Sequence, residues 1–148
     1  MITATDVELR AGARLLLSGC TFRVGPEDRI DVDSLPALRE GVALLGGEPR
    51  ARHVYAAPGA AADVASAWAE VIGDRAWVLP REEAIDAGWF GPVPDALAAR
   101  IGDVVAAPVG PFAIVATKAE PLESSLIGMH GSLTSADQLV PLLRLPTL

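Results

Sequence analysis

The sequence has 148 residues, of which 51% are hydrophobic, and this length supports one domain with a substantial core. Its formal net charge of -7 leaves no basic excess to neutralise the phosphates of a polymer, so nucleic acid is excluded as an expected partner. A single cysteine, Cys20, excludes an internal disulfide, and the sequence shows neither a charged and then apolar leader nor an apolar run of membrane-spanning length. We therefore expect a cytoplasmic protein with no membrane partner.

Residues 1–26 have the pattern of a β-hairpin. Two apolar stretches, 2–9 and 15–24, flank the short segment RAGAR at 10–14. We expect this hairpin to supply extra or edge strands to a sheet.

Residues 1–17 (MITATDVELRAGARLLL) and 22–26 (FRVGP) resemble the N-terminal strands of an ABC-F type ATP-binding cassette ATPase. The resemblance implies a glycine-rich loop ending in Gly-Lys-Ser/Thr shortly afterwards, because backbone N–H groups and a lysine must hold the nucleotide phosphates. Residues 27–33 read EDRIDVD instead, and the loop occurs nowhere in the sequence. Nucleotide hydrolysis of the cassette type is therefore excluded.

Residues 27–50 read as a connector. It contains Asp28, Asp31 and Asp33, then a short apolar segment at 41–45 that GGEP at 46–49 closes. Three carboxylates could hold a hard cation, but the glycine and the distal glutamate of a calcium loop are missing. A solvated turn is the favoured interpretation.

Residues 51–118 alternate between strand and helix patterns. A strand at 53–57 precedes a helix at 60–72 that places Val64, Trp68, Val71 and Ile72 on one face. The later elements are a strand at 76–79, helices at 80–88 and 95–101, and strands at 103–108 and 112–117 that we expect to form a hairpin around 109–111. The prediction is an α+β fold in which a mixed sheet carries this βαβα-plus-hairpin unit, and the whole chain, 1–148, is treated as a single domain.

Residues 119–148 contain a histidine-bearing loop, a short helix and an apolar tail. His130 lies in GMHGSLT at 128–134, where a glycine on each side clears space around the imidazole just before the helix at 135–139. Such a histidine can be a metal ligand or a general base, and the alternative is a turn histidine with a structural hydrogen bond.

His53, beside an inward-facing Val54, reads as a surface residue rather than a ligand. After Pro141, the apolar tail LLRL at 142–145 must bury against something.

From about residue 28 to 143 the sequence resembles the C-terminal part of nucleotide pyrophosphatase/phosphodiesterase-like proteins of the alkaline phosphatase superfamily. Six segments carry the resemblance: 47–55 (GEPRARHVY), 73–79 (GDRAWVL), 83–85 (EAI), 88–92 (GWFGP), 100–103 (RIGD) and 128–134 (GMHGSLT). The resemblance implies that His130 matches the last metal-binding histidine of these two-metal hydrolases.

The same resemblance implies further site residues that this sequence lacks. They are an N-terminal aspartate ligand, a threonine or serine nucleophile, an Asp/His ligand pair and an Asp-His-Gly motif. Where that motif would stand, residues 18–22 read SGCTF, within the cassette-like segment, so the two resemblances meet near 25–29.

We therefore expect a non-catalytic fragment or fusion derived from a metal-dependent phosphodiesterase, without a catalytic residue or a resident cofactor, that associates as a homo-oligomer. The alternative is a metal-dependent phosphodiester hydrolase with a rebuilt site. That site would hold zinc or another divalent metal between His130, carboxylates such as Asp28, Asp31 or Asp33, and His53, from one or two chains.

Overall fold

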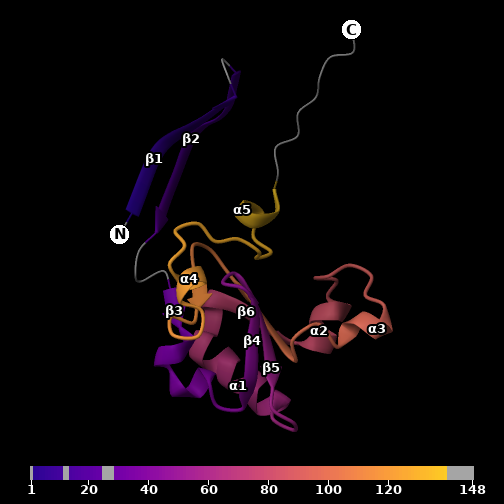
Figure 1. Cartoon of the computed structure of the whole chain (residues 1–148). Helices are drawn as coiled ribbons and strands as arrows, with labels where there is room; N and C mark the ends of the chain where they lie inside the picture. Colours follow the sequence, from indigo (N-terminus) through magenta and orange to yellow (C-terminus); the bar gives the residue numbers. More distant parts are fainter. Residues whose placement is uncertain (1, 12–13, 25–28, 140–148) are drawn as a thin grey trace.

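The computed structural model describes residues 2–11, 14–24 and 29–139, and the statements below concern these residues. Their strands form three sheets (Figure 1). β1 (Ile2–Ala11) pairs only with β2 (Arg14–Val24), in an antiparallel ladder that runs from Ile2 opposite Val24 to Ala11 opposite Arg14. The N-terminal hairpin is thus confirmed.

A four-stranded antiparallel sheet is the main platform of the fold. Its strand order is β4-β5-β7-β6, which places β7 between β5 and β6 although it is the last of the four in sequence. The four strands are β4 (Val42–Glu48), β5 (Ala51–Ala56), β6 (Ala76–Pro80) and β7 (Val104–Pro108).

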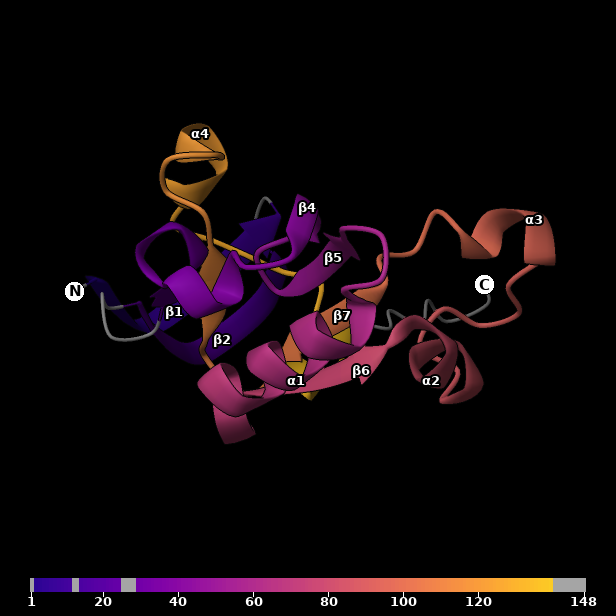
Figure 2. The same cartoon turned by 90° about the horizontal axis from the view of Figure 1, so that it is seen from below.

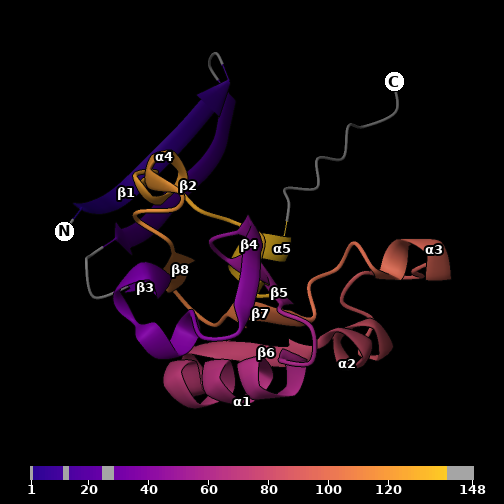
Figure 3. The same cartoon turned by 60° about the horizontal axis from the view of Figure 1, so that its bottom comes forward.

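Helix α1 (Ala61–Ile72) packs on one face of this sheet (Figure 3). It buries Val64, Trp68 and Ile72, which lie four residues apart and therefore share one helical face. The Trp68 indole N–H donates to the carbonyl of Leu38 over 3.1 Å, so this fully buried side chain also satisfies its polar atom. The helix predicted at 60–72 is confirmed, including the face that it buries.

Strand β7 is buried on both faces. Val104 and Ala106 join the core beneath α1, whereas Val105 packs in a smaller cluster with Ala84 and Ile101. The second cluster belongs to the part of the chain that carries α2 (Arg81–Asp86) and α3 (Asp95–Ala98), which lies at the opposite end of the molecule from α4 (Pro121–Ser124) (Figure 2).

A separate parallel pair consists of β3 (Arg29–Asp31) and β8 (Ala113–Val115). Ile30 and Ile114 from this pair belong to the same core cluster as Trp68, so the pair and the four-stranded sheet share one core. The Ile114 amide donates to the carbonyl of Pro49 over 2.7 Å, which fastens β8 to the turn between β4 and β5. The remaining helices are short: η2 (Val32–Ser34), η3 (Pro36–Leu38), η4 (Gly73–Arg75) and α5 (Ser135–Gln138).

The predicted α+β class is confirmed, with parallel and antiparallel pairings both present. The strand-helix-strand-helix order over β5, α1, β6 and α2 is confirmed as well.

The predicted hairpin between 103–108 and 112–117 is wrong. β7 pairs with β5 and β6, and β8 pairs with β3. The physical reason is the composition of β7, VVAAP, which is apolar at every position and therefore suits a central strand covered on both faces.

Two further predictions need correction. Residues 27–50 are more than a connector, because β3 and β4 lie within them, and β4 continues through Gly46 and Gly47 before the chain turns at 49–50. The N-terminal hairpin does not extend another sheet, because within the described residues β1 and β2 pair only with each other.

Candidate functional site

His130 lies exposed on the loop between α4 and α5. Its neighbours hold the loop against the sheet. A Cβ built on Gly131 would lie 3.2 Å from the Cβ of Ala51, so glycine permits this close approach to the turn between β4 and β5. Ser132 is fully buried and donates its hydroxyl to the carbonyl of Pro108. The loop is therefore anchored around His130, while the imidazole itself faces solvent.

Asp31 is engaged in structural hydrogen bonds. Its carboxylate accepts from the hydroxyl of Thr117 over 2.6 Å, from the hydroxyl of Ser34 over 2.8 Å, and from the amides of Thr117 and Asp33. Burial by itself raises the pKa of Asp31, but the hydrogen bonds from Thr117, Ser34 and Asp33 together outweigh burial and lower it. This carboxylate joins the end of β3 to the segment after β8.

Asp33 has a similar role. It accepts from the backbone amides of Lys118 and Ala119 over 2.8 and 3.0 Å. Two of the three carboxylates proposed for a rebuilt metal site therefore accept hydrogen bonds from residues 117–119. The third, Asp28, lies outside the described residues.

His53 is half-buried on β5 rather than a plain surface residue. Its Nδ1 accepts from the amide of Gly102 over 3.2 Å, and its ring meets Phe90 edge-on with the centroids 5.6 Å apart. Burial lowers the pKa of His53, which favours the neutral form that this hydrogen bond requires. Val54 points into the core, as expected. Among the described residues no group of three or more His, Cys, Asp or Glu side chains is placed to hold a metal ion.

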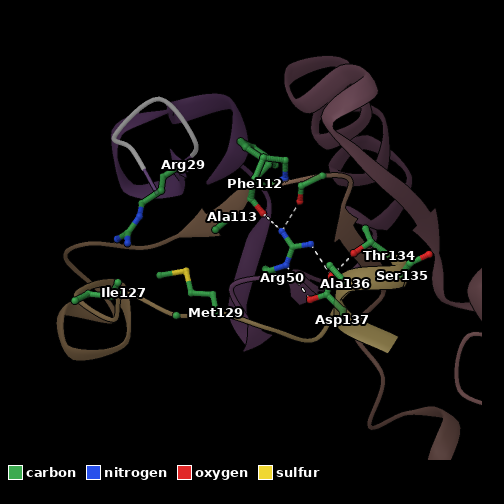
Figure 4. A pocket seen from close by; sticks show the side chains of 13 residues that line it. Arg29, Arg50, Phe112, Ala113, Ile127, Met129, Thr134, Ser135, Ala136 and Asp137 are labelled. Atoms are coloured by element: carbon green, nitrogen blue, oxygen red, sulfur yellow. Dashed lines mark hydrogen bonds and ion pairs between the residues drawn. The ribbon is translucent and has the colours of Figure 1, made fainter. Parts of the chain in front are cut away.

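The structure contains a pocket of about 760 Å³ (Figure 4). Gly128 and Met129, which precede His130 in the sequence, line this pocket, but His130 itself does not. One end is formed by Arg29, Ile127 and Met129, and the other by the start of α5, with Arg50 between them (Figure 4). The residues that line it are Arg29, Arg50, Gly110, Pro111, Phe112, Ala113, Ile127, Gly128, Met129, Thr134, Ser135, Ala136 and Asp137.

Arg50 organises one wall of this pocket. Its guanidinium forms a two-pronged ion pair with Asp137, with Nε to Oδ1 at 2.9 Å and Nη2 to Oδ2 at 2.7 Å. Its Nη1 donates to the carbonyls of Gly110 and Phe112. The hydrogen bonds from Arg50 hold the pKa of Asp137 at about 2 although burial opposes this, and the Thr134 hydroxyl adds to the lowering. Both charged groups are thus satisfied inside the protein.

Arg29 closes the opposite end. Its guanidinium donates to the carbonyl of Ser124 over 2.7 Å and to the carbonyl of Leu126 over 2.9 Å, which positions the segment after α4 beside β3. The pocket consequently offers mainly apolar surface from Phe112, Ile127 and Met129 rather than a set of free polar groups.

A second ion pair joins Arg52 of β5 to Glu120, whose side chain is 22% exposed. Arg52 is fully buried, donates to the carbonyl of Ile114 over 2.8 Å, and lies 2.8 Å from Glu120 through Nη1 and Oε2. Burial raises the pKa of Glu120, and the charge of Arg52 acts against this rise. The pair attaches the segment before α4 to β5.

Neither Arg29 nor Arg50, the two arginines that border the pocket, was predicted from the sequence. Arg50 stands 87 positions from Asp137, and no local pattern signals a contact at that separation. The one available hint was a charged residue directly after the turn-forming Gly-Gly-Glu-Pro, where a strand reverses and a long side chain is brought towards the sheet edge.

Comparison of the sequence with protein-family models and with curated proteins finds no match. In the part of the chain that the structure describes, no helix is long and apolar enough to cross a membrane.

Proposed function

We propose that this chain is a non-catalytic fragment or fusion derived from a metal-dependent phosphodiesterase, similar over residues 28–143 to nucleotide pyrophosphatase-like proteins, and that it acts by associating with further copies of itself. A cytoplasmic location belongs to this proposal, because a chain with Cys20 as its one cysteine gains nothing from an oxidising compartment.

The observation that carries the proposal is the two-stranded parallel pair β3 and β8. Parallel strands occur almost only in larger sheets with both faces covered, so a pair of three-residue strands is typical of the edge of a sheet whose other strands are elsewhere. Within the described residues β3 pairs with a strand on one side only, which makes its second edge the candidate for pairing with another chain.

Exposed apolar side chains lie next to this pair. Leu122, Leu126 and Ile127 form what we call the α4 patch, in which the exposed fractions are 81%, 49% and 57%. Arg29 ties the patch to β3 through the carbonyls of Ser124 and Leu126. Apolar surface beside an open strand edge is the usual composition of a contact between subunits, and a second copy supplies a self-complementary partner.

The absence of catalysis rests on how the candidate ligands are used. Asp31 and Asp33 already accept hydrogen bonds from 117–119, and binding a metal there would release those backbone amides unpaired. His130 is exposed on the loop between α4 and α5, which Ser132 anchors. A divalent metal with one imidazole ligand lacks the coordination that a hydrolytic site needs.

Two measurements test the proposal together. The first is sedimentation equilibrium over a wide range of protein concentration, in which we expect reversible self-association. The second is hydrolysis of a chromogenic phosphodiester with zinc or manganese added, beside a His130→Ala variant and a bound-metal assay. We expect no turnover and no stoichiometric metal in either chain.

Turnover that the His130→Ala variant loses, with stoichiometric metal in the unsubstituted chain, would establish the alternative, a hydrolase with a rebuilt site around His130. A monomer at all concentrations would overturn the association.

A further inference from the structure

The walls of the pocket are fixed by the two arginines that border it. Arg50 binds two carbonyls in 110–112 and the carboxylate of Asp137 on α5. Arg29 binds two carbonyls in 124–126, directly before the wall that contains Met129. A pocket whose walls are held before a ligand arrives loses little conformational entropy on binding. Its volume of about 760 Å³ lies within the range of small-molecule sites, roughly 300–1,000 Å³.

The charged residues that line the pocket leave one positive charge. Arg50 and Asp137 neutralise each other in a two-pronged pair. The third charged residue of the lining, Arg29, forms no ion pair among the described residues, and its hydrogen-bond partners there are two neutral carbonyls. A guanidinium has more N–H donors than these two carbonyls use. Arg29 can therefore bind an anion at its end of the pocket.

Between Arg29 and α5 the surface of the pocket is apolar. Phe112, Ile127 and Met129 contribute side chains to it, and Ala136 lies at the α5 end (Figure 4). An aliphatic chain that lies along these side chains removes apolar area from water. It also leaves the neighbouring ion pair intact, because it needs no hydrogen bond from that pair. The pocket thus combines a long apolar surface with a cation at one end.

We propose that the pocket is a binding site for an amphipathic monocarboxylate, with the carboxylate on Arg29 and the apolar chain directed towards Ala136. A guanidinium binds a carboxylate through charge-assisted hydrogen bonds. One positive charge matches a carboxylate better than a phosphate group, which carries up to about two negative charges at neutral pH. This inference goes beyond the proposed self-association and does not depend on it, because the described residues of one chain form the whole pocket.

The first test is titration calorimetry of the full-length chain with decanoate, decanol and butanoate at neutral pH. We expect saturable binding of one decanoate per chain. Decanol has the same chain without the charge and should bind at least about tenfold more weakly. Butanoate keeps the carboxylate and should bind at least about a hundredfold more weakly, because each buried methylene strengthens binding roughly fourfold.

The second test changes the charge at the end of the pocket. Arg29→Gln should weaken the binding of decanoate about tenfold or more and leave the binding of decanol unchanged, which shows that the pocket still forms. Arg29→Lys keeps the charge and should restore most of the lost affinity for decanoate. A residue that only held the segment after α4 would not separate the two ligands in this way.

The third test narrows the pocket without touching Arg29. Ala136→Phe places a larger side chain at the α5 end and should weaken the binding of both decanoate and decanol. The matched control is Ala69→Phe, which is exposed on α1 outside the pocket and should change neither. Circular dichroism of both variants is expected to match that of the unsubstituted chain.

Each contrary result has a definite meaning. A full-length chain that shows no saturable binding of decanoate overturns the inference. Decanoate and decanol that bind equally well overturn the role of Arg29, and an Ala136→Phe chain that binds decanoate as tightly as the unsubstituted chain overturns the location. Sedimentation equilibrium decides the proposed function separately. A chain that is monomeric at every concentration but binds one decanoate would remove self-association and support this inference.

Discussion

Arg50 connects three parts of the chain that are distant in sequence. It binds Asp137 on α5 and the carbonyls of Gly110 and Phe112 before β8, while standing itself in the turn between β4 and β5. Only 9% of the Arg50 side chain and 5% of the Asp137 side chain are exposed. Water therefore cannot solvate either charge when its partner is removed. This is the geometry in which loss of one partner costs more than the pair contributes.

We therefore predict that Asp137→Asn lowers the free energy of unfolding by about 3 kcal/mol at neutral pH, because it leaves the Arg50 guanidinium buried without a counter-charge. Urea unfolding followed by tryptophan fluorescence measures the change. Asp95→Asn, at an exposed position of α3, is the matched control and should change stability by less than about 0.5 kcal/mol. Equal effects of the two substitutions would contradict the role given to the pair.

The same pair predicts a loss of stability in acid. Asp137 has a pKa of about 2 in the folded protein against 3.8 when unpaired. A lowered pKa means that the unfolded chain takes up the proton first, so the contribution of Asp137 is complete above pH 3.8 and disappears as the pH falls towards 2. It amounts to about 2 kcal/mol. In Asp137→Asn the decline of stability between pH 4 and pH 2 should be smaller by this amount, and an unchanged decline would argue against the pairing.

His53 predicts a pH dependence at milder pH. Its pKa lies below 6.5 in the folded state because the ring is buried, and Nδ1 must stay unprotonated to accept from Gly102. Stability is therefore fully present above pH 6.5 and declines as the pH falls below it, since the unfolded chain binds the proton more readily. His53→Asn should flatten this part of the stability profile. A stability profile that His53→Asn leaves unchanged would contradict the assignment.

At the scale of elements, Gly102 allows the segment that precedes β7 to pack closely against strand β5. A Cβ on this residue would lie 2.5 Å from the amide nitrogen of Val54 and 2.8 Å from the carbonyl carbon of His53, both backbone atoms that cannot rotate away. We predict that Gly102→Ala lowers the free energy of unfolding by about 1–3 kcal/mol. Gly128→Ala, which meets open space, is the control and should be close to neutral in the same urea titration. Similar values for both variants would show that β5 and this segment are not packed as described.

The elements with local signals were predictable from the sequence. α1 has its apolar residues at helical spacing, and the N-terminal hairpin has two apolar runs around a short turn, so both were placed nearly to the residue. The partner of a buried strand was not predictable. β7 is apolar throughout and pairs with two strands earlier in the sequence, and a continuous apolar run does not reveal which neighbours cover it.

The candidate site shows the same limit. Asp31 and Asp33 were recognisable as a cluster of carboxylates, but their role depends on amides 85 and 86 positions away, at Lys118 and Thr117. Arg50 and Asp137 likewise meet across 87 positions. Spacing along the chain carries information about neighbours on one element, and these contacts form between elements, so the pocket could be found only in the folded molecule.

For the whole molecule, association of like-charged copies predicts a specific response to salt. Each chain carries a formal charge of -7, so the two copies of the proposed dimer would repel each other, while the proposed contact at the α4 patch would bury apolar side chains. Raising the ionic strength from about 0.01 M to about 0.15 M shortens the screening length from roughly 30 to roughly 8 Å and weakens this repulsion. We predict a lower dissociation constant at the higher salt concentration. A higher value would indicate an interface held by ion pairs instead.

Self-association is tested most directly by sedimentation equilibrium of the unmodified chain at increasing concentration and constant salt. If a second copy pairs with β3 and covers the α4 patch, the average mass should rise reversibly from 15.4 kDa towards twice that value. A mass that stays at 15.4 kDa across the whole range would contradict self-association as the role of this fold.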